Sequence, residues 1–321
     1  MTEKLAKKVD ALLITTLDDI DWIVNMRGKD IKYNPVFFAY AIFLPASGEE
    51  GSKSNLKLFI TASKVATEEV QAHIKENGIE VYDYTDITEH LKKLAADGKK
   101  IGFDENSCNQ QLFEGFKDSK PTHIENVVQA IKAVKNPTEM QGMRNGNIKN
   151  CASLIQYFAW MEDHLAKNPD SDMTEYTAAK KLEEFRKTRD LYMGPSFDTI
   201  SSIGPNGAVI HYKPEKTTAL KMNNKELYLL DSGVQYLDGT TDITRTVQFG
   251  GCEPTAEQKR RYTQVLLGVL DLERAVWPKG GPYSGADFDT LARRHLWADG
   301  VDYKHGTGHG VGSFNCVHEG P

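Results

Sequence analysis

The chain has 321 residues, of which 40% are hydrophobic and 26% charged, and its 39 Lys and Arg against 45 Asp and Glu give a net charge of −6. This length suggests about two domains, and the composition is that of a globular protein with a sizeable core. The acidic balance and the lack of a dense basic run argue against nucleic acid or an anionic membrane as the partner. No apolar stretch approaches the roughly 20 residues needed to cross a bilayer, so we expect no transmembrane helix.

The amino terminus and the cysteines indicate the compartment. Met1 to Asp10 alternate charged with single apolar residues and lack the apolar core of a signal peptide, so we expect a cytoplasmic protein. The cysteines show neither a metal-binding spacing nor a disulfide framework, which fits reduced thiols that serve in packing. They are Cys108, Cys151, Cys252 and Cys316.

Short apolar segments alternate with amphipathic stretches in the first half of the chain, which predicts an α/β domain. The expected strands are residues 11–16, 39–44, 56–61, 80–82 and 100–103. Helices are expected at residues 63–76 and 87–96, each followed by a glycine that can end it. Residues 47–55, rich in Gly, Ser and charge, are expected to form a surface loop.

The pattern changes at Asn136-Pro137, where Asn136 can cap a helix, Pro137 suits its first position and Glu139 lies near the positive end of the helix dipole. We therefore expect two domains, residues 1–136 and 137–321. The second begins with a long amphipathic helix. After it we expect a helix at 174–187, strands at 196–212, 226–236 and 241–249, and helices at 256–276 and 285–298. Helices followed by a strand cluster make this half α+β.

Two aspartates could share a site. Asp231 directly follows an apolar run, and Asp242 comes eleven residues later. A two-residue turn at Asp238-Gly239 would pair Asp231 with Thr246, which leaves the two acids on one face but roughly 13 Å apart at about 3.3 Å per residue. At that distance they could not share a metal cluster.

Convergence of the two acids requires a different turn. The chain would have to reverse near Tyr236-Leu237, or an irregular turn or bulge would have to lie between Val234 and Thr241. Isolated aspartates are usually strand-end or turn residues, and that interpretation stays open. However, an unpaired carboxylate at the end of a buried strand is costly, so Asp231 calls for a cation.

The carboxyl-terminal block is rich in histidine and glycine. Four glycines within the eight residues that begin at His305 and include His309 disfavour a helix and allow close approach of the backbone to a ligand. Imidazoles serve as metal ligands and proton carriers. A phosphate-binding loop is the alternative, but no Lys followed by Ser or Thr stands where a P-loop needs it. His318 and Glu319 add another titratable pair.

Other catalytic classes have weaker support. His211 follows Val209-Ile210, and its position alone is that of an ordinary core or edge histidine. Ser201-Ser202 lack the glycine pattern of a nucleophile elbow, which disfavours a Ser/His/Asp hydrolase. Cys316 beside His318 remains an alternative as a thiol nucleophile.

Three motifs together resemble those of the pita-bread metallopeptidases, in particular the cytosolic eukaryotic type of Xaa-Pro aminopeptidase (the aminopeptidase P family). They are Ile210-His211-Tyr212, the acid pair within residues 231–246, and the block from His305 to Pro321. Similarity extends to residues 34–38 and 199–205, so it covers nearly the whole chain. The implied fold class is α/β plus α+β, with a creatinase-N-like α/β domain followed by a pita-bread catalytic domain.

The resemblance also implies a chemistry. The family hydrolyses the bond between an amino-terminal residue and a following proline, using water activated by two divalent metal ions, typically Mn²⁺, with Zn²⁺ or Co²⁺ as alternatives. The resemblance assigns Asp231, Asp242 and His309 as ligands of the metals. It places His211, His305 and His318 where substrate is oriented and the tetrahedral intermediate stabilised. The implied partners are peptides with proline at the second position, and the implied assembly is a homodimer.

The chain departs from the family pattern at both ends. The two glutamate ligands of the family lie downstream of the His-Glu-Gly-Pro motif that ends at Pro321, and three-domain members carry a further amino-terminal domain. We therefore expect a middle domain plus an incomplete catalytic domain, weakly active or inactive by itself. The alternative function is a catalytically inactive pita-bread fragment that acts as a binding or dimerisation module.

Overall fold

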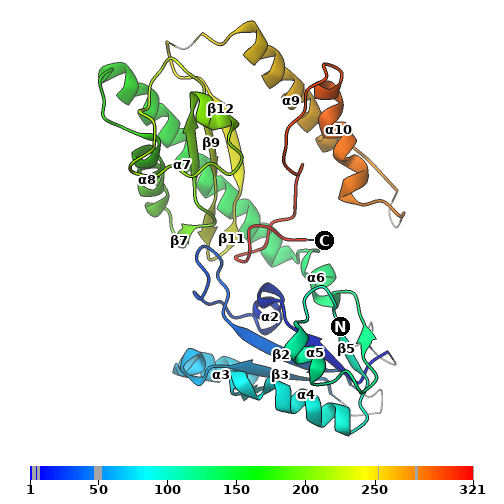
Figure 1. Ribbon diagram of the computed structural model, residues 1–321. Coiled ribbons are helices and arrows are strands. Elements are labelled where there is room, and N and C mark those ends of the chain that lie inside the picture. Colours follow the sequence, from blue (N-terminus) through cyan, green and yellow to red (C-terminus); the bar gives the residue numbers. More distant parts are fainter. Residues whose placement is uncertain (2–4, 6–7, 47–52, 252, 279–280, 321) are drawn as a thin grey trace. The chain divides into compact units, whose positions relative to one another are not determined.

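The computed structural model describes residues 1, 5, 8–46, 53–251, 253–278 and 281–320 (Figure 1). It divides the chain into two compact units, Met1–Gln141 together with Gly312–Pro321, and Gly142–Val311. Residues 47–52 of the expected surface loop, and Cys252, lie outside the described residues.

A six-stranded sheet forms the centre of the first unit, with the strand order β4-β3-β2-β1-β5-β6. Strand β2 pairs antiparallel with β1 and β3, and the outer pairings are parallel. The strands are β1 (Ala11–Ile14), β2 (Ala39–Leu44), β3 (Asn55–Ile60), β4 (Ile79–Tyr82), β5 (Ile101–Phe103) and β6 (Thr122–His123). The helices are α2 (Leu17–Val24), α3 (Glu68–Glu76), α4 (Ile87–Ala96), α5 (Gln110–Glu114) and α6 (Val127–Lys132), with 3₁₀ turns η1 (Ala62–Val65) and η2 (Tyr84–Asp86).

Both faces of this sheet are buried, as strand β1 shows. Leu12 and Ile14 pack into one hydrophobic cluster, which includes Ile20 of α2, and Leu13 packs into a second, which includes Leu91 of α4. Because successive side chains of a strand point to opposite faces, helices must cover both sides. This arrangement confirms the predicted α/β class of the first half.

The five expected strands of this unit are present to within a few residues. The expected helix at 63–76 is divided into η1 and α3, since the side chain of Thr67 accepts a hydrogen bond from the amide of Val70 and starts a new helix there. The sequence pattern does not predict α2, whose eight residues include three aspartates. Two of these, Asp19 and Asp21, are buried.

The second unit combines helices with two three-stranded sheets, whose orders are β11-β10-β7 and β12-β9-β8. Its helices are α7 (Pro137–Lys167), which starts in the first unit, α8 (Glu175–Lys187), α9 (Ala256–Arg274) and α10 (Gly285–Trp297), with the 3₁₀ turn η3 (Gly204–Ala208). Its strands are β7 (Tyr192–Pro195), β8 (Ile200–Ile203), β9 (Tyr228–Ser232), β10 (Val234–Tyr236), β11 (Gly239–Thr240) and β12 (Ile243–Val247).

Two helix starts follow the predicted capping. Helix α7 begins at Pro137, where the amide of Glu139 donates to Asn136 Oδ1 at 2.9 Å and the amide of Asn136 donates to Glu139 Oε2 at 2.9 Å. Helix α9 opens with the expected capping box of Thr255 and Gln258. Local hydrogen bonding therefore decides where both helices start.

The single strand expected at residues 196–212 is wrong. Only Ile200–Ile203 of this range is a strand, and the 3₁₀ turn η3 follows it directly. Gly204 takes a positive φ of 55°, and Pro205 lacks the amide hydrogen that a continuing strand would donate. His211 consequently lies in a turn rather than in a strand.

The hairpin that carries the two aspartates turns one residue earlier than a turn at Asp238-Gly239. Tyr236 pairs with Gly239, and Asp231 pairs with Thr244, so the two loop residues are Leu237 and Asp238. Asp238 is held by a contact distant in sequence, in which Lys149 Nζ of α7 donates to its Oδ1 at 2.9 Å. This tertiary contact favours the observed turn.

The register is constant along the whole hairpin. The amide of Thr241 donates to the Val234 carbonyl at 2.9 Å, and the amide of Val234 donates to Thr241 Oγ1 at 3.1 Å. The bulge expected between these residues is therefore wrong, and the irregular pairing in this region is that of β10 with β7. Asp242 lies two positions from the residue opposite Asp231, on the same face, a diagonal of about 7–8 Å between Cα atoms.

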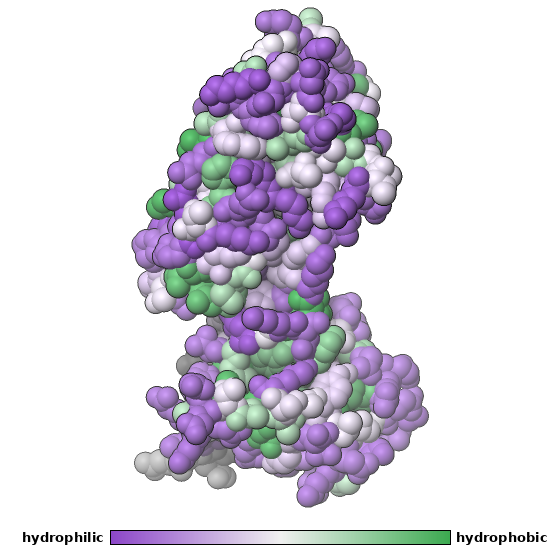
Figure 2. Space-filling model, turned by 90° about the vertical axis from the view of Figure 1, so that its left-hand side faces the viewer, coloured by the Kyte–Doolittle hydropathy of each residue, from purple (hydrophilic) through white to green (hydrophobic). Residues whose placement is uncertain are grey.

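No helix in the described part of the chain combines the length and apolar character that crossing a bilayer requires. On the face drawn in Figure 2, hydrophilic residues predominate and hydrophobic residues form small groups between them. Such scattered apolar groups are ordinary on a protein surface.

Two glycines of α7 test the position of the hairpin turn. A Cβ at Gly142 would lie 1.9 Å from the Asp238 carbonyl oxygen, whereas a Cβ at Gly146 would meet nothing closer than 3.6 Å. We expect Gly142→Ala to lower the free energy of unfolding by about 1–3 kcal/mol, because overpacking must displace the turn. Gly146→Ala should leave it unchanged or raise it by up to about 1 kcal/mol, since alanine favours a helix. Urea unfolding followed by circular dichroism measures both, and equal shifts would contradict the close approach of Asp238.

Candidate metal centre

Asp231, near the end of β9, has a carboxylate that is only partly satisfied. Thr244 on the paired strand donates a side-chain hydrogen bond to it, but its Oδ1 atom is buried and has no hydrogen-bond partner. Burial raises the pKa of Asp231, the charge of Asp242 raises it further, and the hydrogen bond from Thr244 and the charges of His211 and His309 lower it. A buried acceptor without a partner costs free energy, so this oxygen is a candidate ligand for a cation.

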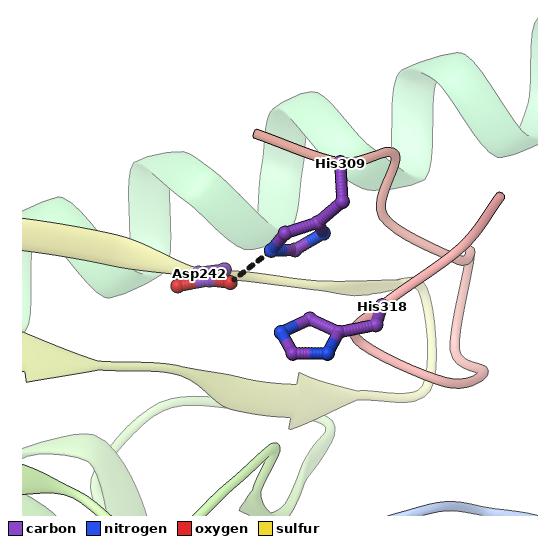
Figure 3. Close-up of side chains that lie close together, drawn as sticks. All are labelled: Asp242, His309 and His318. Atoms are coloured by element: carbon purple, nitrogen blue, oxygen red, sulfur yellow. Dashed lines mark ion pairs between the residues drawn. The ribbon is translucent and has the colours of Figure 1, made fainter. Parts of the chain in front are cut away.

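Asp242 and His309 lie directly against each other. His309 Nε2 is 3.2 Å from Asp242 Oδ2 (Figure 3), and the two side chains are 34% and 20% exposed. The other ring nitrogen, Nδ1, lies 2.6 Å from the carbonyl oxygen of Gly310, which can only accept a proton from it. Imidazole nitrogen and carboxylate oxygen are both ligands of divalent cations, so these two atoms lie where they could coordinate one ion.

His211 is, with His309, one of the two histidines of the described second unit whose charge acts on Asp231. It is exposed, and its φ of 55° is in the left-handed region, which is uncommon for residues other than glycine. Its charge contributes to lowering the pKa of Asp231, which places the imidazole in the electrostatic environment of that carboxylate. The described second unit thus brings together Asp231, Asp242, His309 and His211.

His305 has contacts with its own segment and with α10. Its Nδ1 lies 2.8 Å from the Gly306 carbonyl oxygen, and its ring lies against that of Tyr303, with 4.7 Å between centroids. Arg293 of α10 donates to the His305 carbonyl oxygen at 2.7 Å. These contacts fix the backbone of the segment and leave the side chain exposed.

His318 belongs to the first unit, because the chain returns there at Gly312. Asn315 Nδ2 donates to the Asp18 carbonyl oxygen at 3.0 Å, and Arg27 donates to the carbonyl oxygens of Ser313 and Phe314. Of the three residues labelled in Figure 3, Asp242 and His309 belong to the second unit and His318 to the first.

The neighbours of His318 in sequence are strongly buried. Glu319, only 3% exposed, forms ion pairs with Lys132, at 3.4 Å, and with Lys135. Burial raises the pKa of the Cys316 thiol to about 12. A thiol with such a pKa carries almost no thiolate at neutral pH, which argues against Cys316 as a nucleophile.

Arg186 holds the aspartate hairpin in place through hydrogen bonds, and no sequence motif indicates this residue. Its guanidinium, in a side chain only 2% exposed, donates to Asn150 Oδ1 at 3.0 Å, to Ser232 Oγ at 2.8 Å and to the Gly233 carbonyl oxygen at 3.3 Å. Ser232 and Gly233 directly follow Asp231. The sequence carries one signal of this role, because Arg186 lies four residues after Leu182 on the buried face of α8.

The donor set fits a divalent cation. Asp231 and Asp242 offer carboxylate oxygens from one face of the hairpin, and His309 offers an imidazole nitrogen. Carboxylate oxygens suit Mn²⁺, and imidazole nitrogen suits Zn²⁺ and other transition metals. The buried oxygen of Asp231 and the close approach of Asp242 and His309 are the observations that favour this use.

Comparison with known proteins gives these residues a context. The family model of the creatinase/prolidase N-terminal domain matches residues 1–139, and that of metallopeptidase family M24 matches residues 141–321. Relatives named "Probable Xaa-Pro aminopeptidase P" from Sordaria macrospora and Botryotinia fuckeliana are 46% and 45% identical over 326 residues each. Those alignments cover 98% and 99% of this chain but 50% and 48% of the relatives. The chain thus spans about half the length of the curated relatives it matches.

Solved structures agree with these matches. The crystal structure of the X-prolyl aminopeptidase from Caenorhabditis elegans, described as a cytosolic enzyme with a di-nuclear active site, is 35% identical with a TM-score of 0.90. The match covers 100% of this chain and 51% of that one. An Xaa-Pro dipeptidase from Bacillus anthracis, 19% identical with a TM-score of 0.73 over 100% of this chain and 82% of its own, shares the fold. The chain therefore belongs to metallopeptidase family M24, with a creatinase/prolidase N-terminal domain followed by a pita-bread metallopeptidase domain.

Proposed function

We propose that the protein is a metal-dependent aminopeptidase, which releases the amino-terminal residue from peptides that have proline at the second position. The names of its relatives and the di-nuclear site ascribed to the Caenorhabditis elegans enzyme support this proposal. Asp231, Asp242 and His309 are the proposed metal ligands, with Mn²⁺ as the proposed metal and Zn²⁺ or Co²⁺ as alternatives.

One observation carries the assignment of the metal site. Asp231 keeps a buried carboxylate oxygen without a hydrogen-bond partner on the face of the hairpin that also carries Asp242, whose own partner is His309. A residue that served only to end a strand would be expected to satisfy both oxygens. Burial raises the pKa of Asp231, so a metal would compete with a proton for this carboxylate and binding should weaken as the pH falls.

The remaining histidines would handle the substrate. Bound divalent cations would supply Lewis acidity and lower the pKa of water at the site. His211, in the electrostatic environment of Asp231, would donate a hydrogen bond to the negative charge that develops on the scissile carbonyl oxygen. His305 and His318 are proposed to orient the peptide and to carry protons, by the resemblance to the family.

The rest of the proposal concerns domains, partners and location. We place the domain boundary between residues 136 and 137, where α7 begins. A cytoplasmic location agrees with the description of the Caenorhabditis elegans enzyme as cytosolic, and a homodimer is proposed from the resemblance. The 321-residue chain by itself is proposed to be weakly active or inactive, because two carboxylates and one imidazole are few ligands for two cations.

Metal binding should depend on the proposed ligands and not on the general negative charge of the protein. We expect Asp231→Asn and His309→Ala each to weaken Mn²⁺ binding about tenfold or more, a loss of at least ~1.4 kcal/mol. Asp231→Asn should at the same time raise the thermal stability of the metal-free protein, because it removes a desolvated negative charge that lies near the charge of Asp242. Free Mn²⁺ measured by electron paramagnetic resonance and a thermal melt test both effects.

The matched control is Asp238→Asn on the same hairpin, whose carboxylate binds Lys149. It should keep the Mn²⁺ affinity of the unmodified chain. Equal losses of affinity in Asp238→Asn and Asp231→Asn would show that general negative charge, and not the proposed site, binds the ion.

Peptide hydrolysis tests the reaction. With added Mn²⁺ we expect the 321-residue chain to cleave an X-Pro peptide slowly or not at all, and robust turnover would contradict the proposed need for further ligands. In any active preparation His318→Ala should retain metal and lose roughly 100-fold in turnover, the scale of losing one transition-state hydrogen bond. Elemental analysis that found His318→Ala as metal-depleted as His309→Ala would contradict the division of roles.

A further inference from the structure

A buried carboxylate lies beneath the loop that carries His211. Glu175, the first residue of α8, is 0% exposed, and its described hydrogen bonds all come from uncharged donors. The donors are the Ile203 amide (2.8 Å to Oε1), Asn206 Nδ2 (3.1 Å to each oxygen), Tyr212 Oη (2.6 Å to Oε2) and the Leu220 amide (2.9 Å to Oε2). These donors occupy about the four lone-pair sites that a carboxylate offers. Glu175 is thus saturated and has no site left for a substrate or a cation.

The four donors hold the two ends and the middle of one loop, residues 204–220. Ile203 ends strand β8 before the loop, and Leu220 closes it, where its carbonyl oxygen also accepts from the Glu175 amide at 2.9 Å. The free energy cost of burying an anion is offset only when its hydrogen bonds are all made, and the amino-terminal end of α8 adds a favourable dipole. Loss of the hydrogen bond from any one of these donors to Glu175 should therefore destabilise the conformation of the whole loop.

His211 occupies the strained position of this loop. Its left-handed φ of 55° persists only if the surrounding structure holds it. The next residue, Tyr212, supplies that restraint, because its hydroxyl donates to Glu175 and accepts a hydrogen bond from Asn206 Nδ2 at 3.0 Å. Burial, and after it the hydrogen bond to Glu175, raise the pKa of the Tyr212 hydroxyl, so it remains a donor at neutral pH.

We propose that Glu175 is a positioning residue for His211, acting through the hydroxyl of Tyr212. Its carboxylate anchors Tyr212, and Tyr212 fixes the backbone that directs the His211 imidazole into the environment of Asp231. This inference rests on the proposed function only for the catalytic role of His211. The positioning itself is a property of the metal-free chain.

The test compares two tyrosines that donate to carboxylates of the same helix. Tyr212→Phe removes the bond to Glu175, and the control Tyr192→Phe removes the 3.0 Å bond from Tyr192 to Glu183, which also lies on α8. Imidazole signals of the metal-free chain, labelled with ¹⁵N-histidine, report on ring position. The signals of His211 are assigned by their loss in His211→Gln. Hydrogen exchange of residues 204–220 reports on the loop.

We expect a single set of His211 ring signals in the unmodified chain and in Tyr192→Phe. In Tyr212→Phe these signals should shift or split, and the amides of residues 204–220 should exchange at least about tenfold faster. Glu175→Gln, which keeps the size of the side chain, should show the same changes if it folds. If it does not fold, Tyr212→Phe alone decides.

Unchanged His211 signals and unchanged exchange in Tyr212→Phe would overturn the inference, as would equal changes in Tyr192→Phe. The outcome is separate from that of the proposed function. Failure of the unmodified chain to bind Mn²⁺ would overturn the proposed metal site. It would not change the interpretation of the histidine signals and the hydrogen exchange, which are measured on metal-free protein.

Discussion

A buried guanidinium fixes the point at which the aspartate hairpin passes from one sheet to the other. Arg186 donates to Ser232 and Gly233, between the segment of the hairpin that pairs with β8 and the segment that pairs with β7. Because the register is constant through this point, the position of Asp231 determines that of Asp242. An arginine so fully buried tolerates no loss of its acceptors, so the hairpin and α8 are bound to one geometry.

Helix α8 connects the two halves of the candidate site. Its buried residues are Glu175, Ala178, Leu182 and Arg186, which recur at the spacing of one helical face. Glu175 at one end holds the histidine loop, and Arg186, three turns later, holds the aspartate hairpin. The described hydrogen-bond partners of both side chains are uncharged groups of strands, of the loop 204–220 and of helix α7. A rigid helix thus sets the distance between the segments that supply an imidazole and the carboxylates.

Sequence patterns predict the structural features that are determined by interactions between neighbouring residues. The cap at Asn136, five of the six described strands of the first unit and the starts of α8 and α9 depend on neighbouring residues and were predictable, whereas the two-residue strand β6 was not. The hairpin turn at Leu237-Asp238 contacts Lys149, far away in sequence, and sequence patterns alone left its position open. Sequence motifs identified the candidate metal ligands. No motif indicates Glu175, because its role depends on hydrogen-bond donors that come together only in the folded loop.

The return of residues 312–320 to the first unit sets an order for synthesis. Lys132 is buried with Asp19 in that unit, yet Glu319, which completes its ion pairs, leaves the ribosome only after the entire second unit. While the second unit is being synthesised, Lys132 of the nascent first unit therefore lacks its ion pair with Glu319. Contacts of such long sequence separation form late and slowly. Residues 312–320 can therefore join the first unit only after residues 142–311 have been synthesised.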